Sequence, residues 1–379
     1  MRIIDRYLLR QFLQTFVICF VSLTGLCIVF DAFTHLDDFL RCAERGRGLL
    51  ALMGTHYAYQ SLFFFDRTSG LLALTSAMFT VTWIQRHNEM TALMSAGIPR
   101  IRVVAPLIFA VIAISLLTAA NRELVLPRFR NELVRQPTDP LGDVGQDFQQ
   151  QYDNDTDILF RGKATFAAQQ RIEKPDFLLP ATLGQFAKQL AAANAYYRPP
   201  RTDWPGGYLF EGMEQPKDLA TRPSLMVEGM PVVITPRDAP DRLKANQCFV
   251  VSNVTFDLLT GGRAFRQFAS TPELIAGLRN RSNSFGADVR VAIHGRILNP
   301  LLDITLLFLG LPLVLTRESR NVFLAIGMCL VVVSIFLGVA IGCQSLGAQS
   351  MLLSPALAAW LPLILFVPGA VAAAQGMWE

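Results

Sequence analysis

The chain has 379 residues, of which 52% are hydrophobic and 17% are charged, and its formal net charge is +4 at pH 7. A soluble domain usually carries about 25% charged residues, so this chain has few polar side chains with which to cover a globular surface. The composition argues against an ordinary soluble protein and indicates an integral membrane protein.

Apolar segments of the length that crosses a bilayer as helix, about 17 to 25 residues, recur along the chain. Residues 321–378 hold no Asp, Glu, Lys or Arg over 58 positions, which is too long for one span, so we expect a division at 342–350 into two helices. The pattern predicts a polytopic α-helical membrane protein with six transmembrane helices, the first four at 11–30, 68–85, 103–120 and 297–316.

The first ten residues, MRIIDRYLLR, precede the first span. Apolar side chains recur there at helical spacing, at Ile4, Leu8 and Phe12, while Arg2 and Arg6 fall on the opposite face. This pattern favours a short helix at the membrane surface over a frayed polar terminus. The following apolar run is too long for a signal peptide and has no cleavage site after it, so we expect a retained first helix.

The arginine distribution predicts the orientation of the spans. Positively charged residues are enriched on the cytoplasmic side of membrane proteins. Eight arginines fall on one side and four on the other: Arg2, Arg6, Arg10, Arg86, Arg100, Arg102, Arg317 and Arg320 against Arg41, Arg45, Arg47 and Arg67. Both termini are therefore expected in the cytoplasm, with residues 121–296 outside.

The stretch RHNEMTALMSAGIPR, residues 86–100, separates the second and third spans. Its spacing predicts a helix of about 12 residues over 86–98, roughly 18 Å long. Gly97 and Pro99 are expected to end it. The predicted apolar stripe consists of Met90, Leu93, Met94 and Gly97, continuing back to Trp83, and the outward face carries Glu89, Ala92 and Ala96. A simple turn needs only about two to eight residues, so an amphipathic helix here suggests docking into a separate cytoplasmic subunit.

Residues 121–296 hold 22 of the 34 basic and 20 of the 30 acidic residues, as expected of a water-soluble domain inserted between two sets of three helices. Its near-neutral charge argues against nucleic acid as a partner. Short alternating segments punctuated by Pro, Gly, Asn and Asp predict a β-rich core. These segments are DILFRG at 157–162, GYLFEG at 207–212, MPVVITP at 230–236, QCFVVSNVTFDLL at 247–259 and RAFRQFAS at 263–270. Residues 121–150 and 163–200 contain more Ala, Gln and Leu and are expected to be loop or helix. The segment STPELIAGLRN, 270–280, predicts a capped helix.

Motifs for enzymatic chemistry are missing from the sequence. It contains no P-loop, H-E-x-x-H or G-x-S-x-G pattern, and its four histidines show no metal-ligand spacing. The run DNDTD at 153–157 lacks the Gly and terminal Glu of a calcium loop, which favours an acidic surface turn. Asp303 lies within an apolar run, where a partly buried ion pair with Arg296 is expected in preference to a proton relay. Cys42 and Cys248 could form a disulfide, although nothing in their setting demands one.

Five segments of the chain together point to a known family: IIDRYLLRQFLQTF, NEMTALMSAGIPRIRVVAPL, STPEL, HGRILNPLLDITLLFLGLPLVL and LSPALAAWLPLILF. Through them the sequence resembles the lipopolysaccharide-export permeases of the LptF/LptG type along nearly its whole length. This resemblance implies six spans, a periplasmic β-jelly-roll-like domain, and an ABC transporter permease that passes lipopolysaccharide from the inner membrane to a periplasmic jelly-roll bridge protein. The implied partners are a cytoplasmic P-loop ATPase dimer, which holds the ATP and Mg, and a second permease subunit, paralogous or identical; this chain is expected to hold no cofactor.

The resemblance also implies site residues. The ATPase contact maps onto Glu89, Ala92, Leu93, Ala96 and Gly97. The family tends to carry a basic residue near the outer end of the first helix, where this chain has Asp31. Candidate contacts for lipid phosphates are therefore the arginines Arg41, Arg45, Arg67, Arg128, Arg130 and Arg296.

Two other functions remain compatible with the sequence. One is a membrane receptor that signals through the helix at Glu89, and the other is a mechanotransmitter that acts on an external enzyme without moving lipid. Co-purification of an ATPase separates the receptor from the transporter, and lipid release separates the mechanotransmitter from it.

Overall fold

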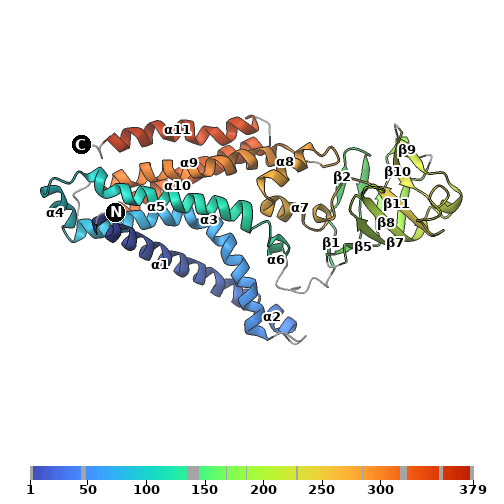
Figure 1. The fold of residues 1–379 in the computed structure, drawn as a ribbon, viewed down its shortest axis with the longest axis horizontal. Helices are drawn as coiled ribbons and strands as arrows, with labels where there is room; N and C mark the ends of the chain where they lie inside the picture. Colours follow the sequence, from blue (N-terminus) through green and yellow to red (C-terminus); the bar gives the residue numbers. More distant parts are fainter. Residues whose placement is uncertain are drawn as a thin grey trace. The chain divides into compact units, whose positions relative to one another are not determined.

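The computed structural model describes residues 3–43, 48–134, 145–315 apart from 168, 185, 228 and 284, 322–349 and 353–375. They form two compact units (Figure 1). The helical unit comprises the described residues up to Phe129 and from Gly286, and the β unit comprises those in Arg130–Phe285. The predicted domain limits of 121 and 296 fall inside helices of the helical unit, because these helices continue past their apolar segments into polar residues.

The helical unit contains long helices at each predicted span. Its helices are α1 Ile3–Thr34, α2 Leu36–Ala43, α3 Leu49–Arg86, α4 Glu89–Ser95, α5 Arg100–Ala120, the π-helical η1 Asn121–Val125, α9 Ala287–Leu315, α10 Val322–Ala348 and α11 Pro355–Gln375. Five of the described helices are long and apolar enough to cross a membrane: α1, α5 with η1, α9, α10 and α11.

Helix α3 covers the predicted span 68–85, but it is less apolar on average than these five helices and is not among them. The reason lies in its packing, because α3 contacts α1, α5 and α9. Its buried positions include Ser76 and Thr80, whose hydroxyls donate to backbone carbonyls one turn earlier. Such hydroxyls lower the mean hydropathy of a helix that is surrounded by other helices, so the sixth span is not identified by apolar character.

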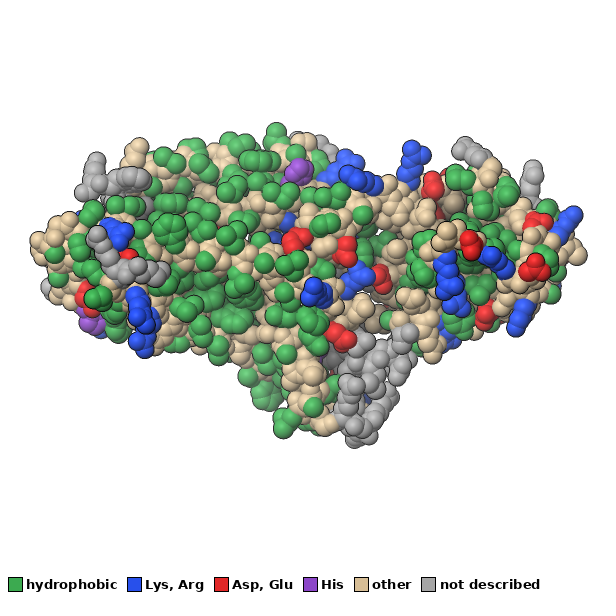
Figure 2. Space-filling model, viewed as in Figure 1, with side chains coloured by type: hydrophobic (Ala, Val, Ile, Leu, Met, Phe, Trp, Pro, Cys, Tyr) green, Lys and Arg blue, Asp and Glu red, His purple; other side chains and the backbone are tan. Residues whose placement is uncertain are grey.

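The core of the helical unit joins α1, α3, α5 and α9, with Leu8, Leu74, Leu107 and Leu311 almost fully buried. Large apolar side chains also lie on its surface, and Figure 2 shows them spread over the helices. A soluble monomer rarely exposes a continuous apolar surface of this extent. The arrangement is that expected where lipid replaces water around the helices.

The predicted division of the last apolar stretch is displaced toward the C-terminus. Helix α10 continues through Gly342 to Ala348, and α11 begins at Pro355. Gly347 lies directly against Ala358 of α11, where a Cβ at Gly347 would overlap the alanine methyl. Small residues thus allow a close approach of α10 and α11.

The β unit is built on one antiparallel sheet with the order β1-β4-β5-β7-β8-β11-β10-β9, and β2, β3 and β6 join it through β7. The aromatic residues Phe160, Phe177, Tyr208 and Phe210 pack together in its core. The strands are β1 Gln146–Asp147, β2 Gln151–Asp153, β3 Ile158–Phe160, β4 Ala164–Phe166, β5 Arg171–Glu173, β6 Asp176–Leu178, β7 Gln189–Arg198, β8 Gly207–Gln215, β9 Leu225–Val227, β10 Met230–Ile234 and β11 Gln247–Val251.

Helices α6 Arg130–Val134, α7 Phe256–Phe268 and α8 Thr271–Arg279 complete the described elements of the β unit, with 3-10 turns at Ala181–Leu183 and Leu219–Thr221. The predicted strand over 263–270 is wrong, because most of it lies in α7. The expectation of loop or helix in 163–200 is also wrong, because four strands form there, and Ala192 and Ala195 of β7 are buried. The capped helix is confirmed at α8, where Ser270 and Glu273 form a capping box.

Two predicted features of the β unit have structural roles. Asp153, the first residue of DNDTD, is buried and accepts hydrogen bonds from Ser252 Oγ and from the backbone N–H of Asp155. Cys248 is a buried free thiol 3.5 Å from the sulfur of Met213, and burial raises its pKa. The side chain of Cys42 lies outside the described residues, so a pairing with Cys248 has no support from the structure.

Candidate functional site

Helix α4 is the segment predicted to contact a cytoplasmic subunit, and it has seven residues rather than twelve. The N-terminal part of the predicted helix belongs to α3, which continues to Arg86. Asn88 then adopts a left-handed conformation with φ 57°, which breaks the helix and turns the chain into α4. Asn tolerates this conformation better than most residues, so the local sequence explains the break.

The C-terminal end of α4 is a Schellman motif. The N–H of Gly97 donates to the carbonyl of Met94, and the N–H of Ile98 donates to the carbonyl of Leu93. Gly97 has φ 79°, as the sequence predicts for the residue that ends the helix. Leu93 and Ile98 both pack against the core of the helical unit, which supplies the apolar contact typical of this motif.

The inner side of α4 is anchored by Met90, which is buried, and by Leu93. Met94, Gly97 and Trp83, predicted to belong to the same stripe, are exposed instead. Trp83 lies in α3 and Gly97 follows the end of α4, so neither continues the face of α4 that Met90 and Leu93 occupy. The outward residues Thr91, Ala92, Met94, Ser95, Ala96 and Gly97 form an exposed surface, which we call the α4 surface. It consists of small side chains around one methionine.

Glu89 lies at the edge of the α4 surface and is half-buried. Tyr7 of α1 donates a hydrogen bond of 3.3 Å to Glu89 Oε1. One turn into α5, Arg102 pairs with Asp5 of α1 at 3.3 Å. The start of α1 thus contacts the first residue of α4 and the first turn of α5, an arrangement that the sequence pattern did not predict.

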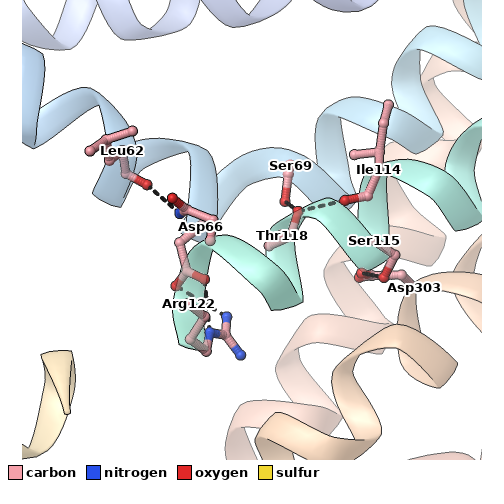
Figure 3. Close-up of polar contacts among 9 residues, drawn as sticks. Leu62, Asp66, Ser69, Ile114, Ser115, Thr118, Arg122 and Asp303 are labelled. Atoms are coloured by element: carbon pink, nitrogen blue, oxygen red, sulfur yellow. Dashed lines mark hydrogen bonds and ion pairs between the residues drawn. The ribbon is translucent and has the colours of Figure 1, made fainter. Parts of the chain in front are cut away.

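A second group of polar residues, the polar cluster, lies among α3, α5, η1 and α9 (Figure 3). Arg122 donates from Nε and Nη2 to the two carboxylate oxygens of Asp66, at 2.8 and 3.1 Å, and the two side chains are 17% and 8% exposed. Asn121 donates to the carbonyl of Leu62 at 3.0 Å. The cluster consists of Asp66, Ser69, Ser115, Thr118, Asn121, Arg122 and Asp303.

The π-helical turn that follows α5 carries Asn121 and Arg122 of the cluster. Within η1 the N–H of Leu126 bonds to the carbonyl of Asn121 five residues earlier. π-helical turns are rare and occur frequently at functional sites. From the sequence alone, adjacent Asp66 and Arg67 at the entry of the second span are expected to contact water or lipid head groups, and the partner Arg122 is not predicted. The only available signal was that Arg122 immediately follows a predicted span.

Asp303 of α9 joins the same cluster. Its Oδ2 accepts a hydrogen bond of 2.7 Å from Ser115 Oγ of α5 (Figure 3). Its other carboxylate oxygen lies on the backbone of Gly70 in α3, where a Cβ would overlap it. The carboxyl group therefore joins three helices, and the ion pair expected with Arg296 stays a prediction.

Replacing Gly70 by Ala is expected to destabilise the helical unit. The new methyl group would overlap Asp303, and such overpacking typically costs about 1–3 kcal/mol, more than the roughly 1 kcal/mol that alanine gains in a helix. The measurement is the unfolding temperature of the full chain in detergent. Gly54→Ala in the same helix is the control, since no atom lies near its Cβ position. Adding Asp303→Ala to Gly70→Ala should recover the loss, and equal effects of G70A and G54A would contradict the packing argument.

The candidate lipid-binding arginines that the structure describes belong to different elements of the two units. Arg41, Arg67 and Arg128 are exposed, and the guanidinium of Arg67 lies over the ring of Phe63 at 5.3 Å. Arg296 is half-buried in α9. Arg130 belongs to the β unit and Arg45 lies outside the described residues.

Arg130 is held by structural contacts. It pairs with Asp257 at 2.7 Å and Glu273 at 3.6 Å, and its guanidinium lies over Phe265. A guanidinium with two carboxylate partners has less positive charge to offer a lipid phosphate. Arg130 is therefore a weaker candidate for lipid binding than the exposed arginines. Arg41, Arg67 and Arg128 remain candidates by their exposure.

Asp31, where the resembling family tends to be basic, also has local partners. Tyr57 of α3 donates a hydrogen bond of 2.9 Å to Asp31 Oδ2, and His35 lies 3.3 Å from Oδ1. Tyr57 is buried with Phe39 and Leu52 in a small apolar cluster. The carboxylate thus fastens the end of α1 to α3.

Comparison with known proteins finds one family. A family model described as lipopolysaccharide export system permease LptF/LptG matches residues 6–173 and 232–374. The match includes the predicted coupling residues and the polar cluster, and it leaves out 174–231, which contains strands β6 to β9. No curated protein matches the chain significantly.

Proposed function

Because the chain belongs to the LptF/LptG family of lipopolysaccharide export system permeases, we propose that it is the permease subunit of an ABC transporter. In this role it extracts lipopolysaccharide, or a related anionic glycolipid, from the inner membrane and passes it to a periplasmic bridge toward the outer membrane. A permease of this family is a transporter rather than an enzyme, and ATP hydrolysis belongs to a cytoplasmic P-loop ATPase dimer. A second permease subunit, paralogous or identical, completes the membrane part.

The observation that carries the proposal is the α4 surface. A helix that is anchored on one side by Met90 and Leu93 and presents small side chains on the other supports close docking of a second protein. Glu89, at the edge of this surface, offers a carboxylate oxygen to a basic group of the partner. The short contacts from α1 to Glu89 and Arg102 then couple the docked partner to the first membrane helix.

The proposed topology has six spans, with both termini and α4 in the cytoplasm and the β unit in the periplasm. Helix α3 supplies the sixth span, since it has 38 residues and packs against three of the apolar helices. The arginine distribution supports this orientation.

The β unit supports transfer to another jelly-roll-like domain. Strand β9 ends the sheet, and Met226 and Met230 beside this edge are 59% and 60% exposed. An edge strand with free backbone groups can pair with a strand of another protein. We propose that the bridge protein joins the sheet at such an edge.

The test is ATP-dependent lipid release from proteoliposomes. The full chain is reconstituted with a second permease subunit, a candidate ATPase and lipopolysaccharide, and a soluble jelly-roll protein is supplied as acceptor. The expected result is lipid on the acceptor only when ATP is hydrolysed. ATP hydrolysis without release would favour the mechanotransmitter, and failure of any ATPase to associate would favour the receptor.

A further inference from the structure

A pocket on the β unit is lined by more arginine than carboxylate side chains. It has a volume of about 670 Å³, within the range of small-molecule sites. Three arginines line it together with one carboxylate, that of Asp203, which leaves an excess of two positive charges. The lining residues that matter are Arg198, Arg201, Asp203, Trp204, Arg242 and Phe249.

The backbone holds the pocket wall in a defined shape. Residues 201–204 form a tight turn in which the N–H and carbonyl groups of Arg201 and Trp204 bond to each other, at 2.9 and 3.2 Å. Gly207, which follows, lies so close to the backbone of Val250 that any side chain would collide with it. The turn therefore leads into β8, a strand that is fastened closely to β11.

Aromatic packing positions two of the pocket residues. The ring of Trp204 contacts the buried Phe249 edge-on, with centroids 5.4 Å apart. The guanidinium of Arg242 lies over the Trp204 ring at 4.8 Å and donates to the carbonyl of Asp203 at 3.1 Å. These contacts restrain Arg242 and leave its charge without a carboxylate partner among the described residues.

The other two arginines are also available to a ligand. Arg198 is the last residue of β7, Arg201 begins the turn, and both side chains are exposed. Neither forms an ion pair with a carboxylate in the part of the chain that the structure describes. Guanidinium groups bind phosphate with charge-assisted, frequently bidentate hydrogen bonds. The apolar floor and the indole ring add a surface on which a sugar ring can pack.

We propose that this pocket binds a phosphorylated sugar, with the phosphate held by Arg198, Arg201 and Arg242 and the sugar against Trp204. The first two arginines and the tryptophan lie in 174–231, outside the family match, so membership of the family assigns them no role. The proposal stands independently of the transport function.

The test is isothermal titration calorimetry on the full chain in detergent, with glucose 6-phosphate as the probe. Inorganic phosphate and glucose are titrated separately. We expect glucose 6-phosphate to bind more tightly than either, because only it engages both the arginines and the aromatic wall. Equal affinity for glucose 6-phosphate and inorganic phosphate, or no binding of glucose 6-phosphate, would overturn the proposal.

Variants assign the binding to this pocket. Arg198→Gln and Arg242→Gln should each weaken glucose 6-phosphate binding about tenfold, since each removes a charge-assisted hydrogen bond. Arg237→Gln is the matched control, because Arg237 is an exposed arginine of the same unit outside the pocket. A loss in R237Q equal to that in R198Q would mean nonspecific attraction and would also overturn the proposal. Unfolding temperatures of all variants show that the fold is retained.

Discussion

Replacing Glu89 by Arg is expected to abolish co-purification of the cytoplasmic ATPase with the chain. The substitution reverses the charge at the edge of the α4 surface, and like charges facing each other across an interface cost several kcal/mol. The measurement is the amount of ATPase retained when the two proteins are co-expressed and the permease is purified in detergent.

Three variants show whether such a loss reflects docking. Ala92→Arg places a bulky charge on the exposed α4 surface away from any core residue, and it should abolish the association equally. Glu214→Arg makes the same charge change at an exposed position of the β unit and should leave the association unchanged. Tyr7→Phe removes the hydrogen bond to Glu89, and the ATPase should still bind. Retention of the ATPase by both E89R and A92R would refute docking on α4.

Replacing Arg122 by Leu is expected to destabilise the helical unit by about 3–5 kcal/mol, the usual cost of removing one partner of a buried ion pair. Asp66, only 8% exposed, would keep its charge without the two hydrogen bonds from the guanidinium. The measurement is equilibrium unfolding of the full chain in detergent, followed by circular dichroism.

The double variant decides how this loss is interpreted. Adding Asp66→Leu to Arg122→Leu removes the remaining charge and should recover most of the stability, since apolar pairs often replace buried ion pairs without loss. Arg128→Leu, at an exposed arginine six residues away, should change stability little. If R122L were no less stable than R128L, the ion pair would not hold α3 to η1.

The helices of this protein were largely predictable, because crossing a bilayer requires long apolar segments and these are visible in the sequence. The residues at which these helices begin and end were less predictable. Helix α1 extends from Ile3 to Thr34 and α3 from Leu49 to Arg86, well beyond the apolar cores at 11–30 and 68–85. Polar residues continue a helix outside the hydrocarbon region, where hydropathy no longer marks its limits.

The β unit was predictable in class but not in pairing. Local alternation located β8, β10 and β11, yet strand β7 reads as an alanine-rich segment and pairs with β5, β6 and β8. Burial between neighbouring strands overrides the low β propensity of alanine. Residues 263–270 show the converse, since their Phe and Arg residues alternate in part and nevertheless lie mainly in a helix.

The contacts of the candidate site also differ in how far they could be predicted from the sequence. Gly97 and Met90 followed from spacing within a few residues, so their roles were predictable. The contact of Tyr7 with Glu89 spans 82 positions and that of Arg122 with Asp66 spans 56. Which helices become neighbours decides these pairs, and a single sequence carries little information about that.

The two left-handed residues at the ends of α4 have a mechanical consequence. Asn88 fixes the direction in which α4 leaves α3, and Gly97 fixes the direction in which the chain continues into α5. A long helix accommodates a sideways load by bending gently along its length, whereas a helix of two turns held at both ends rotates as one body. Torque applied to α4 is therefore expected to act on α3 and α5 together, and Asp66 of α3 is itself paired with Arg122 in η1, the π-helical turn that continues α5.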